Sequence, residues 1–172
     1  MFGRKRNPKL ILDACCGGRM MWYQKDHPNT LYVDQRRYEE KLSNGQNFKV
    51  RPDQIVDYRN MPFKSESFHL VAFDPPHFFS QKPTGWLAKK YGILDKETWR
   101  DDLKQGFDEC WRVLKVNGTL VVKWSVEKGS KSRSIPVQDI IKVFGRDPLF
   151  GTRPGSHSNT YWLIFMKTDR NG

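Results

Sequence analysis

The chain has 172 residues, 37% of them hydrophobic, which suits one domain with its own core but not two, so residues 1–172 are predicted to form a single domain. The 30 Lys and Arg against 19 Asp and Glu give a formal net charge of +11, which favours a polyanionic partner such as DNA or RNA; the alternative is that this charge serves solubility alone. Neither an apolar run of about twenty residues nor a secretory signal is found, which argues against a membrane protein and predicts a cytoplasmic one.

The first half of the chain alternates short apolar segments with polar ones. Each apolar segment has the length of a buried strand, and an acidic residue follows each of them. A run of small residues after the first segment indicates a sharp turn into a helix that ends before Pro28. The predicted strands cover residues 10–12, 31–33, 54–56 and 68–73, and the predicted helices cover residues 19–25 and 36–42.

The second half contains the clearest helical pattern. Thr98 and Asp101 form a capping pair for a helix whose apolar residues recur at helical spacing until Asn117 and Gly118 end it. Two more strands are predicted over residues 119–126 and 160–166, a helix over residues 137–144, and a loop over residues 151–160. Short apolar strands that alternate with helices predict a mostly parallel sheet with helices on both faces.

Acidic residues gather at the carboxyl ends of the predicted strands, where parallel sheets bind ligands. They are Asp13, Asp34, Asp57 and Asp74. The three-glycine phosphate fingerprint is missing and the acids would repel a pyrophosphate, so we expect a neutral or cationic ligand with ribose and adenine parts. Asp34 is placed to accept hydrogen bonds from ribose hydroxyls and Asp57 from an adenine amino group, although any one strand-end acid can simply form a turn.

Four segments together resemble the motifs of class I S-adenosylmethionine-dependent methyltransferases. In chain order they read "LILDACCGGRMMWY", "LYVD", "IVDYRNMPFKSESFHLVAFDPP" and "DECWRVLKVNGTLVVKW". The resemblance covers most of residues 9–125 and implies one Rossmann-like α/β domain with an antiparallel last strand, and S-adenosyl-L-methionine as cofactor. The double-cysteine glycine loop also resembles that of small phage and prophage-associated methyltransferases.

The resemblance implies which residues hold the cofactor. They are Asp13, Ala14, Cys15, Cys16 and Gly17 near the methionine part, Asp34 at the ribose, Asp57 and Tyr58 near the adenine, and Asp74. The family usually has glycine at three alternate loop positions, which in this chain are Cys15, Gly17 and Arg19. A cation at Arg19 can pair with the carboxylate of the cofactor.

Asp74, Pro75, Pro76 and His77 resemble the (Asp/Asn)-Pro-Pro-aromatic motif of enzymes that methylate exocyclic amino groups of bases. The Asp74 carboxylate and the Pro75 carbonyl would accept hydrogen bonds from the amino group, and the prolines would keep both acceptors rigid. His77 or Phe78 would stack on the base. The alternative is that the motif only ends a strand and that Phe78 and Phe79 belong to the core.

The segment after this motif is a candidate for substrate binding. Basic residues interleaved with aromatic ones suit a single strand or a flipped base. The candidates are Phe78, Lys82, Trp86, Lys89 and Lys90; the alternative is an ordinary loop capped by a buried Trp86. The basic segment 125–134 is expected to grip phosphates, whereas His157 is expected to be an ordinary loop histidine.

Three functions remain open from the sequence. The first is an S-adenosylmethionine-dependent N-methyltransferase acting on adenine N6 or cytosine N4 in RNA or DNA. The second keeps the cofactor but uses a small molecule or a protein amide as the acceptor, and the third is a nucleic-acid-binding module without turnover. Cys15, Cys16 and Cys110 have neither the spacing of a zinc site nor that of a disulfide framework, so no metal is predicted.

Overall fold

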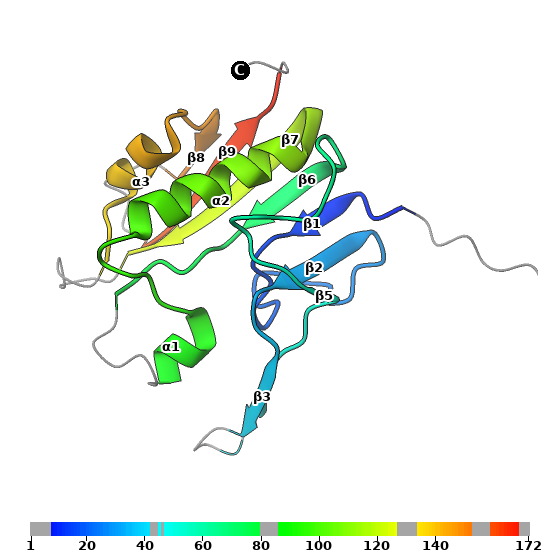
Figure 1. The fold of residues 1–172 in the computed structure, drawn as a ribbon, viewed down its shortest axis with the longest axis vertical. Coiled ribbons are helices and arrows are strands. Elements are labelled where there is room, and N and C mark those ends of the chain that lie inside the picture. Colours follow the sequence, from blue (N-terminus) through cyan, green and yellow to red (C-terminus); the bar gives the residue numbers. More distant parts are fainter. Residues whose placement is uncertain are drawn as a thin grey trace, which may run out of the picture.

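The structure is a computed structural model of the chain and describes residues 8–41, 45, 47–79, 86–126, 134–152 and 159–168. Figure 1 shows a twisted sheet with its longest helix packed across it. The strands are β1 (Ile11–Asp13), β2 (Thr30–Asp34), β3 (Tyr38–Lys41), β4 (Asn47–Val50), β5 (Gln54–Ile55), β6 (Phe68–Phe73), β7 (Leu114–Ser125), β8 (Phe150–Gly151) and β9 (Thr160–Met166). The helices are α1 (Trp86–Tyr91), α2 (Trp99–Val113) and α3 (Val137–Phe144).

Seven strands form the main sheet in the order β5-β2-β1-β6-β7-β9-β8. β5, β2, β1, β6 and β7 are parallel, and β9 lies antiparallel between β7 and β8. The prediction of a mostly parallel α/β sheet with an antiparallel last strand is therefore confirmed. The strand order reverses between β1 and β6, which makes their carboxyl ends the switch point where such sheets bind ligands.

Two predicted helices are wrong. Residues 14–29 run in turns, because Gly17 and Arg19 both take positive φ angles, 46° and 54°, that an α-helix cannot contain. The predicted helix over residues 36–42 is instead β3, which pairs with β4 in a separate two-stranded sheet. There Glu39 lies opposite Lys49 and forms ion pairs with Lys49 and Arg51.

The long helix is shorter than predicted and is capped differently. α2 ends at Val113 and β7 begins at the next residue, so Asn117 and Gly118 lie inside a strand, at a bend where Asn117 has a φ of 63°. The Thr98 side chain caps no backbone group; the Asp95 carboxylate accepts hydrogen bonds from the Glu97 and Thr98 N–H groups just before the helix. α3 and β9 have the predicted bounds, whereas α1 and β8 were not predicted.

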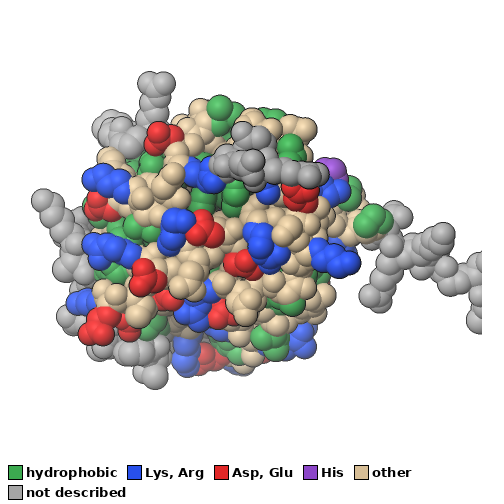
Figure 2. Space-filling view, turned by 45° about the horizontal axis from the view of Figure 1, so that its top comes forward, with side chains coloured by type: hydrophobic (Ala, Val, Ile, Leu, Met, Phe, Trp, Pro, Cys, Tyr) green, Lys and Arg blue, Asp and Glu red, His purple; other side chains and the backbone are tan. Residues whose placement is uncertain are grey.

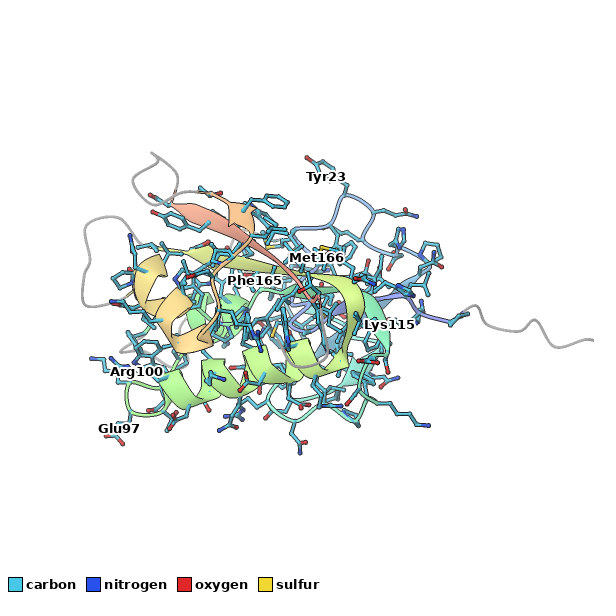
Figure 3. The ribbon with its side chains drawn as sticks, turned by 90° about the horizontal axis from the view of Figure 1, so that it is seen from above. Tyr23, Glu97, Arg100, Lys115, Phe165 and Met166 are labelled. Atoms are coloured by element: carbon cyan, nitrogen blue, oxygen red, sulfur yellow. The ribbon has the colours of Figure 1, made fainter. Side chains whose placement is uncertain are left out.

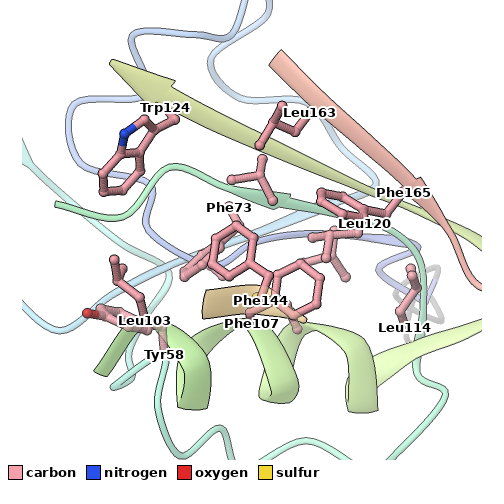
Figure 4. Close-up of a cluster of buried hydrophobic side chains, with 14 of the residues drawn as sticks. Tyr58, Phe73, Leu103, Phe107, Leu114, Leu120, Trp124, Phe144, Leu163 and Phe165 are labelled. Atoms are coloured by element: carbon pink, nitrogen blue, oxygen red, sulfur yellow. The ribbon is translucent and has the colours of Figure 1, made fainter. Parts of the chain in front are cut away.

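The core lies between α2, α3 and one face of the sheet (Figure 4). Phe107 of α2 stacks on Phe144 of α3 with 4.3 Å between ring centroids, and its edge meets Phe165 of β9. Gly106 lets α2 approach closely, since a Cβ atom there would lie 2.4 Å from Tyr58 and 2.9 Å from Phe73. α2 is thereby fixed beneath the last residue of β6.

The 14–29 segment packs on the face of the sheet opposite α2 and α3. Asp13 pairs with Tyr32 and Ala72 across neighbouring strands, so these side chains share the face opposite Phe73. Trp22 from the 14–29 segment packs there against Tyr32. Figure 3 shows α2 and α3 on one side of the sheet and Tyr23 on the other. Among the described helices, none has the length and apolar character needed to span a bilayer.

Candidate active site

Asp13, at the end of β1, is fully buried at the switch point. Its Oδ2 accepts a hydrogen bond of 2.7 Å from the Trp22 indole, and its Oδ1 accepts one of 3.3 Å from the Cys15 N–H. Burial outweighs these bonds and raises the pKa of Asp13 to about 7, with Asp74 and Asp34 adding to the rise. Asp13, Asp34 and Asp74 therefore lie close enough to interact, as the strand order predicts.

The turn after β1 leaves its backbone open on one side. A Cβ atom at Gly17 would meet nothing within 4 Å, and the positive φ of this residue disfavours any other amino acid. The neighbouring Ala14 and Cys16 are buried and carry hydrogen bonds to the two flanking strands, from the Ala14 N–H to Ala72 and from the Cys16 N–H to Val33. The turn is thus a fixed, small-residue surface that a ligand can approach.

Arg19 is turned away from this opening. Its guanidinium bonds Asp26 and Asp53 and lies over the Tyr32 ring, 3.8 Å from the centroid. In these contacts the Arg19 charge is already paired, so the structure offers no support for the predicted pairing with a cofactor carboxylate. Arg19 itself has a positive φ of 54°, and its side-chain contacts hold it in this conformation.

Asp34, at the end of β2, is 4% exposed and its carboxylate is fully engaged. Oδ2 accepts a 2.9 Å hydrogen bond from the Gly17 N–H, and Oδ1 accepts bonds from the Arg36 N–H and from Arg36 Nε at 3.0 Å. Asp34 thus ties the turn to β2, and the Arg36 guanidinium stands where the resemblance places ribose hydroxyls. The hydrogen-bonding capacity of Asp34 is therefore largely used within the chain.

Asp57 and Tyr58 follow β5 and lie in different surroundings. Arg59 pairs with the Asp57 carboxylate at 2.7 Å and lowers the pKa of this group, and it also bonds Asp102 of α2. Tyr58 is buried in the core against Phe73 and offers little surface to a ligand. Asp57 is half-exposed, but both of its oxygens accept hydrogen bonds from Arg59.

Asp74 directly follows β6, and its two oxygens differ in environment. Oδ2 forms an ion pair with Lys123 Nζ of β7 at 2.7 Å, with the two side chains 23% and 22% exposed. Oδ1 is buried and has no hydrogen-bond partner among the residues that the structure describes. Buried oxygens of native proteins are nearly always paired, so an unpaired Oδ1 is unusual and leaves a hydrogen-bond acceptor unused within the described residues.

His77 is enclosed by rings rather than free. Its ring lies 5.8 Å from Phe78, 6.1 Å from Tyr91 and 5.9 Å from Trp124, centroid to centroid. Burial and the Lys123 charge lower the pKa of His77 against the raising effect of Asp74. His77 Nδ1 lies 3.3 Å from the Pro75 carbonyl oxygen, and the neutral ring with its proton on Nδ1 donates to it. Pro75 and Pro76 are both buried.

α1 is tied to the end of β2 and to β3, beyond the carboxyl ends of the parallel strands (Figure 1). Arg36 Nη1 and the Tyr38 hydroxyl both donate to the Lys89 carbonyl, and Lys89 Nζ pairs with Glu40 at 2.8 Å. A Cβ atom at Gly92 would lie 2.9 Å from Pro76, so the chain after α1 touches the motif. Lys89 is therefore occupied within the chain; Lys90 lies 5.0 Å from the Tyr91 ring centroid.

Some predicted substrate residues lie outside the described residues. These are Lys82, the side chain of Trp86, residues 127–133 and His157. Conversely, sequence reasoning did not identify Trp22, Arg36, Lys123 or Trp124 as parts of the site. The only signal for Lys123 was a charged residue inside an apolar strand, and such a residue in a central strand has to find a partner.

The three cysteines are free thiols, and burial raises the pKa of each above its ordinary value. Their thiolate forms are therefore suppressed, which argues against a nucleophilic role. On the face seen in Figure 2, Lys and Arg side chains are interspersed with Asp and Glu rather than gathered into one patch.

No protein-family model and no curated protein matches the sequence. Solved structures do match. The Burkholderia thailandensis 1,6-didemethyltoxoflavin-N1-methyltransferase, with S-adenosylhomocysteine bound, has 11% sequence identity and a TM-score of 0.51, with 94% of this chain and 72% of that chain covered. A Leishmania major SAM-dependent methyltransferase has 12% identity and a TM-score of 0.48, with 90% and 63% covered.

A candidate DNA modification methylase of Thermus thermophilus, complexed with S-adenosyl-L-methionine, has 24% identity and a TM-score of 0.43, with 66% of this chain covered. The present chain covers 54% of that protein, about half of its length. Sequence identities this low indicate a shared fold and nothing more about activity. The chain has the Rossmann-like fold of S-adenosylmethionine-dependent methyltransferases.

Proposed function

We propose that the protein is an S-adenosylmethionine-dependent N-methyltransferase that acts on an exocyclic amino group, adenine N6 or cytosine N4, of a nucleic acid. The observation that carries this proposal is the unpaired, buried Oδ1 of Asp74. Asp74 follows β6 at the switch point of the sheet, next to the turn after β1, and two prolines come directly after it in the chain. A stiff acceptor at this place has no structural task within the described chain, and it suits a substrate that brings a hydrogen-bond donor.

The residues around the β1 turn fit the cofactor in part. The open side of Gly17 and the small side chains of Ala14, Cys15 and Cys16 would accept the methionine part, and Asp57 would accept from the adenine amino group. Asp34 would hold the ribose once Arg36 releases it. When bound, the cofactor supplies a methyl group on a positively charged sulfur, which leaves as a neutral thioether.

The residues of the chain would prepare the acceptor nitrogen. An exocyclic amino group is a weak nucleophile because its lone pair is delocalised into the ring. Hydrogen bonds to Asp74 Oδ1 and to the Pro75 carbonyl would favour a tetrahedral nitrogen whose lone pair is localised. Both acceptors also favour the positive charge that develops on the nitrogen, and because Pro75 and Pro76 restrict the backbone, little reorganisation is needed.

A nucleic-acid substrate is supported by two features. The net charge of +11 favours association with a polyanion, and the aromatic group around His77 offers rings beside Asp74 for a base to contact. DNA and RNA fit these residues equally well, because both carry the phosphates and the amino-bearing bases. A base inside a duplex cannot reach such a site, so the target base must be unpaired or flipped out.

A small-molecule acceptor is the second candidate. The Burkholderia thailandensis enzyme, whose fold this chain shares over 94% of its length, is named for N1-methylation of 1,6-didemethyltoxoflavin rather than of a nucleic acid. Such a substrate would use the same Asp74 oxygen but would leave the basic charge of the surface without a role.

The test measures cofactor binding and transfer separately. Calorimetry should show binding of S-adenosyl-L-methionine, and mass spectrometry of nucleosides should show a methylated base after reaction with single-stranded DNA, transfer RNA or ribosomal RNA. Asp74→Ala should lower turnover by about 100-fold or more with little change in cofactor affinity, whereas Asp139→Ala, on the remote helix α3, should change neither. Near-native turnover of Asp74→Ala would rule out this site.

A further inference from the structure

Lys123 is the only charged side chain of β7 beyond its bend, and the sheet places it directly beside Asp74. Phe73 pairs with Val122 in the parallel register of β6 and β7, so the next residue of each strand lies side by side. The ion pair between Lys123 Nζ and Asp74 Oδ2 is short, 2.7 Å, and both side chains are more than three-quarters buried. A partly buried pair of this kind holds its geometry better than an exposed one.

The ion pair distinguishes the two oxygens of Asp74. With Oδ2 bound to Lys123, rotation of the carboxylate is opposed, and Oδ1 is the carboxylate oxygen that has no partner among the described residues. The next residue of β7 supports the motif from the other face of the sheet, because Trp124 is buried, donates its indole N–H to Ile135 at 2.9 Å, and packs against His77. Consecutive residues of one central strand thus brace Asp74 and His77.

The same ion pair also changes the charge that a substrate meets. The Asp74 carboxylate and the Lys123 ammonium cancel, and the nearby Asp34 is paired with Arg36. The carboxylates of Asp74 and Asp34 therefore offer little unpaired negative charge to attract a cationic amine, and an ammonium beside Asp74 would meet Lys123. A neutral amino group conjugated with a ring or a carbonyl meets no such penalty, and it brings the hydrogens that Asp74 Oδ1 lacks.

We propose that Lys123 is a positioning residue that fixes Asp74 Oδ1 toward the acceptor and restricts the acceptor to neutral, planar amino groups, excluding alkylammonium groups such as those of polyamines and lysine side chains. This inference rests on the proposed methyltransferase function. It assigns a role to a residue outside the motif and gives a physical reason why cationic amines are excluded.

The experiment compares Lys123→Met and Lys123→Arg with a matched control, Lys104→Met, which removes a lysine from an exposed ion pair with Asp108 on α2. Methyl transfer to a single-stranded oligonucleotide containing adenine and cytosine gives kcat and KM, and calorimetry gives the Kd of the cofactor. Lys123→Met should lower kcat by about tenfold or more, with the cofactor Kd changed by less than about twofold. Lys123→Arg should recover a large part of kcat, and Lys104→Met should match the wild type.

A double-mutant cycle with Asp74→Asn separates positioning from general damage to the fold. If Lys123 acts through the carboxylate, adding Lys123→Met to Asp74→Asn should cause little further loss of kcat. Losses that multiply, or an unchanged kcat in Lys123→Met, would overturn the proposal. Circular dichroism and thermal unfolding show whether each variant is folded. If Lys123→Met is not folded, the kcat of Lys123→Arg still decides the test.

The choice of acceptor is tested with spermidine and a lysine-rich peptide in place of the oligonucleotide. The wild type should methylate the oligonucleotide and neither cationic amine. Transfer to spermidine at a rate equal to or above that for the oligonucleotide would refute the selectivity while leaving the methyltransferase activity standing. If the protein neither binds the cofactor nor methylates any acceptor, it is the proposed function that fails.

Discussion

Asp13→Asn is a sharp test of the electrostatics at the end of β1. The carboxyl is completely buried, and its pKa is raised from 3.8 to about 7, first by burial and then by Asp74 and Asp34. A pKa difference of one corresponds to about 1.4 kcal/mol, so once Asp13 is ionised in both states the folded state is disfavoured by about 4 kcal/mol relative to a neutral side chain.

The sign follows from proton binding. Between the unfolded pKa near 4 and the folded pKa near 7, the folded state holds the proton more tightly than the unfolded chain, so stability falls as the pH rises through this window. About 2 to 3 kcal/mol of this loss falls between pH 5 and pH 8. Asparagine cannot ionise, so the variant should lack this part of the pH dependence.

Urea denaturation of wild type and Asp13→Asn at pH 5 and pH 8 measures the effect. Asparagine cannot accept both the Trp22 and the Cys15 hydrogen bonds in the same way, so a constant loss of about 1 kcal/mol at both pH values is expected. Relative to wild type, the variant should gain about 2 to 3 kcal/mol on going from pH 5 to pH 8. Equal losses of stability in both proteins over this range would show that Asp13 is ionised throughout and refute the reasoning.

Two further predictions concern Arg36 and Gly106. Arg36→Gln removes the guanidinium from the Asp34 carboxylate, so calorimetry should show S-adenosyl-L-methionine binding several-fold more tightly. Arg37→Gln, which removes a neighbouring guanidinium bound to the Pro52 carbonyl, is the control. Weaker binding by Arg36→Gln would mean that Arg36 helps to hold the ligand. Gly106→Ala places a Cβ atom 2.4 Å from Tyr58. The cost of this overlap should exceed the gain in helix propensity, so urea titration should show a free energy of unfolding lower by about 1 to 3 kcal/mol. Gln105→Ala, on the exposed face of α2, should leave the free energy of unfolding almost unchanged in the same titration.

Much of the sheet could be predicted because its strands are short apolar runs ended by acids. The strand ends at Asp13, Asp34 and Asp74 and the helix over residues 137–144 were predicted at or within one residue of where they lie. The helix over residues 19–25 failed because tertiary contacts decide this segment. Trp22 reaches back to Asp13, and Arg19 keeps a left-handed conformation through ion pairs distant in the sequence, so local propensity is overruled.

The candidate site, like the fold, could be predicted from the sequence only in part. The position of Asp74 after its strand follows from an apolar run that stops at two prolines, which is local information. The partners of the acids are not local. Lys123 meets Asp74 through the register of β6 and β7, and Arg36 covers Asp34 through its choice of side-chain conformation. Neither register nor rotamer can be read from the residue pattern alone, and the roles of these site residues stay predictions.

The outermost strands of the main sheet are each only two residues long, β5 at one border and β8 at the other. Unpaired backbone groups at a sheet border are a template on which another chain can add a strand, and this risk grows with the length of the border. At β8 the backbone of Gly151 also lies so close to the Trp162 carbonyl that a Cβ atom there would overlap it. Within the described residues, each of these two outermost strands is therefore only a short template for the addition of another strand.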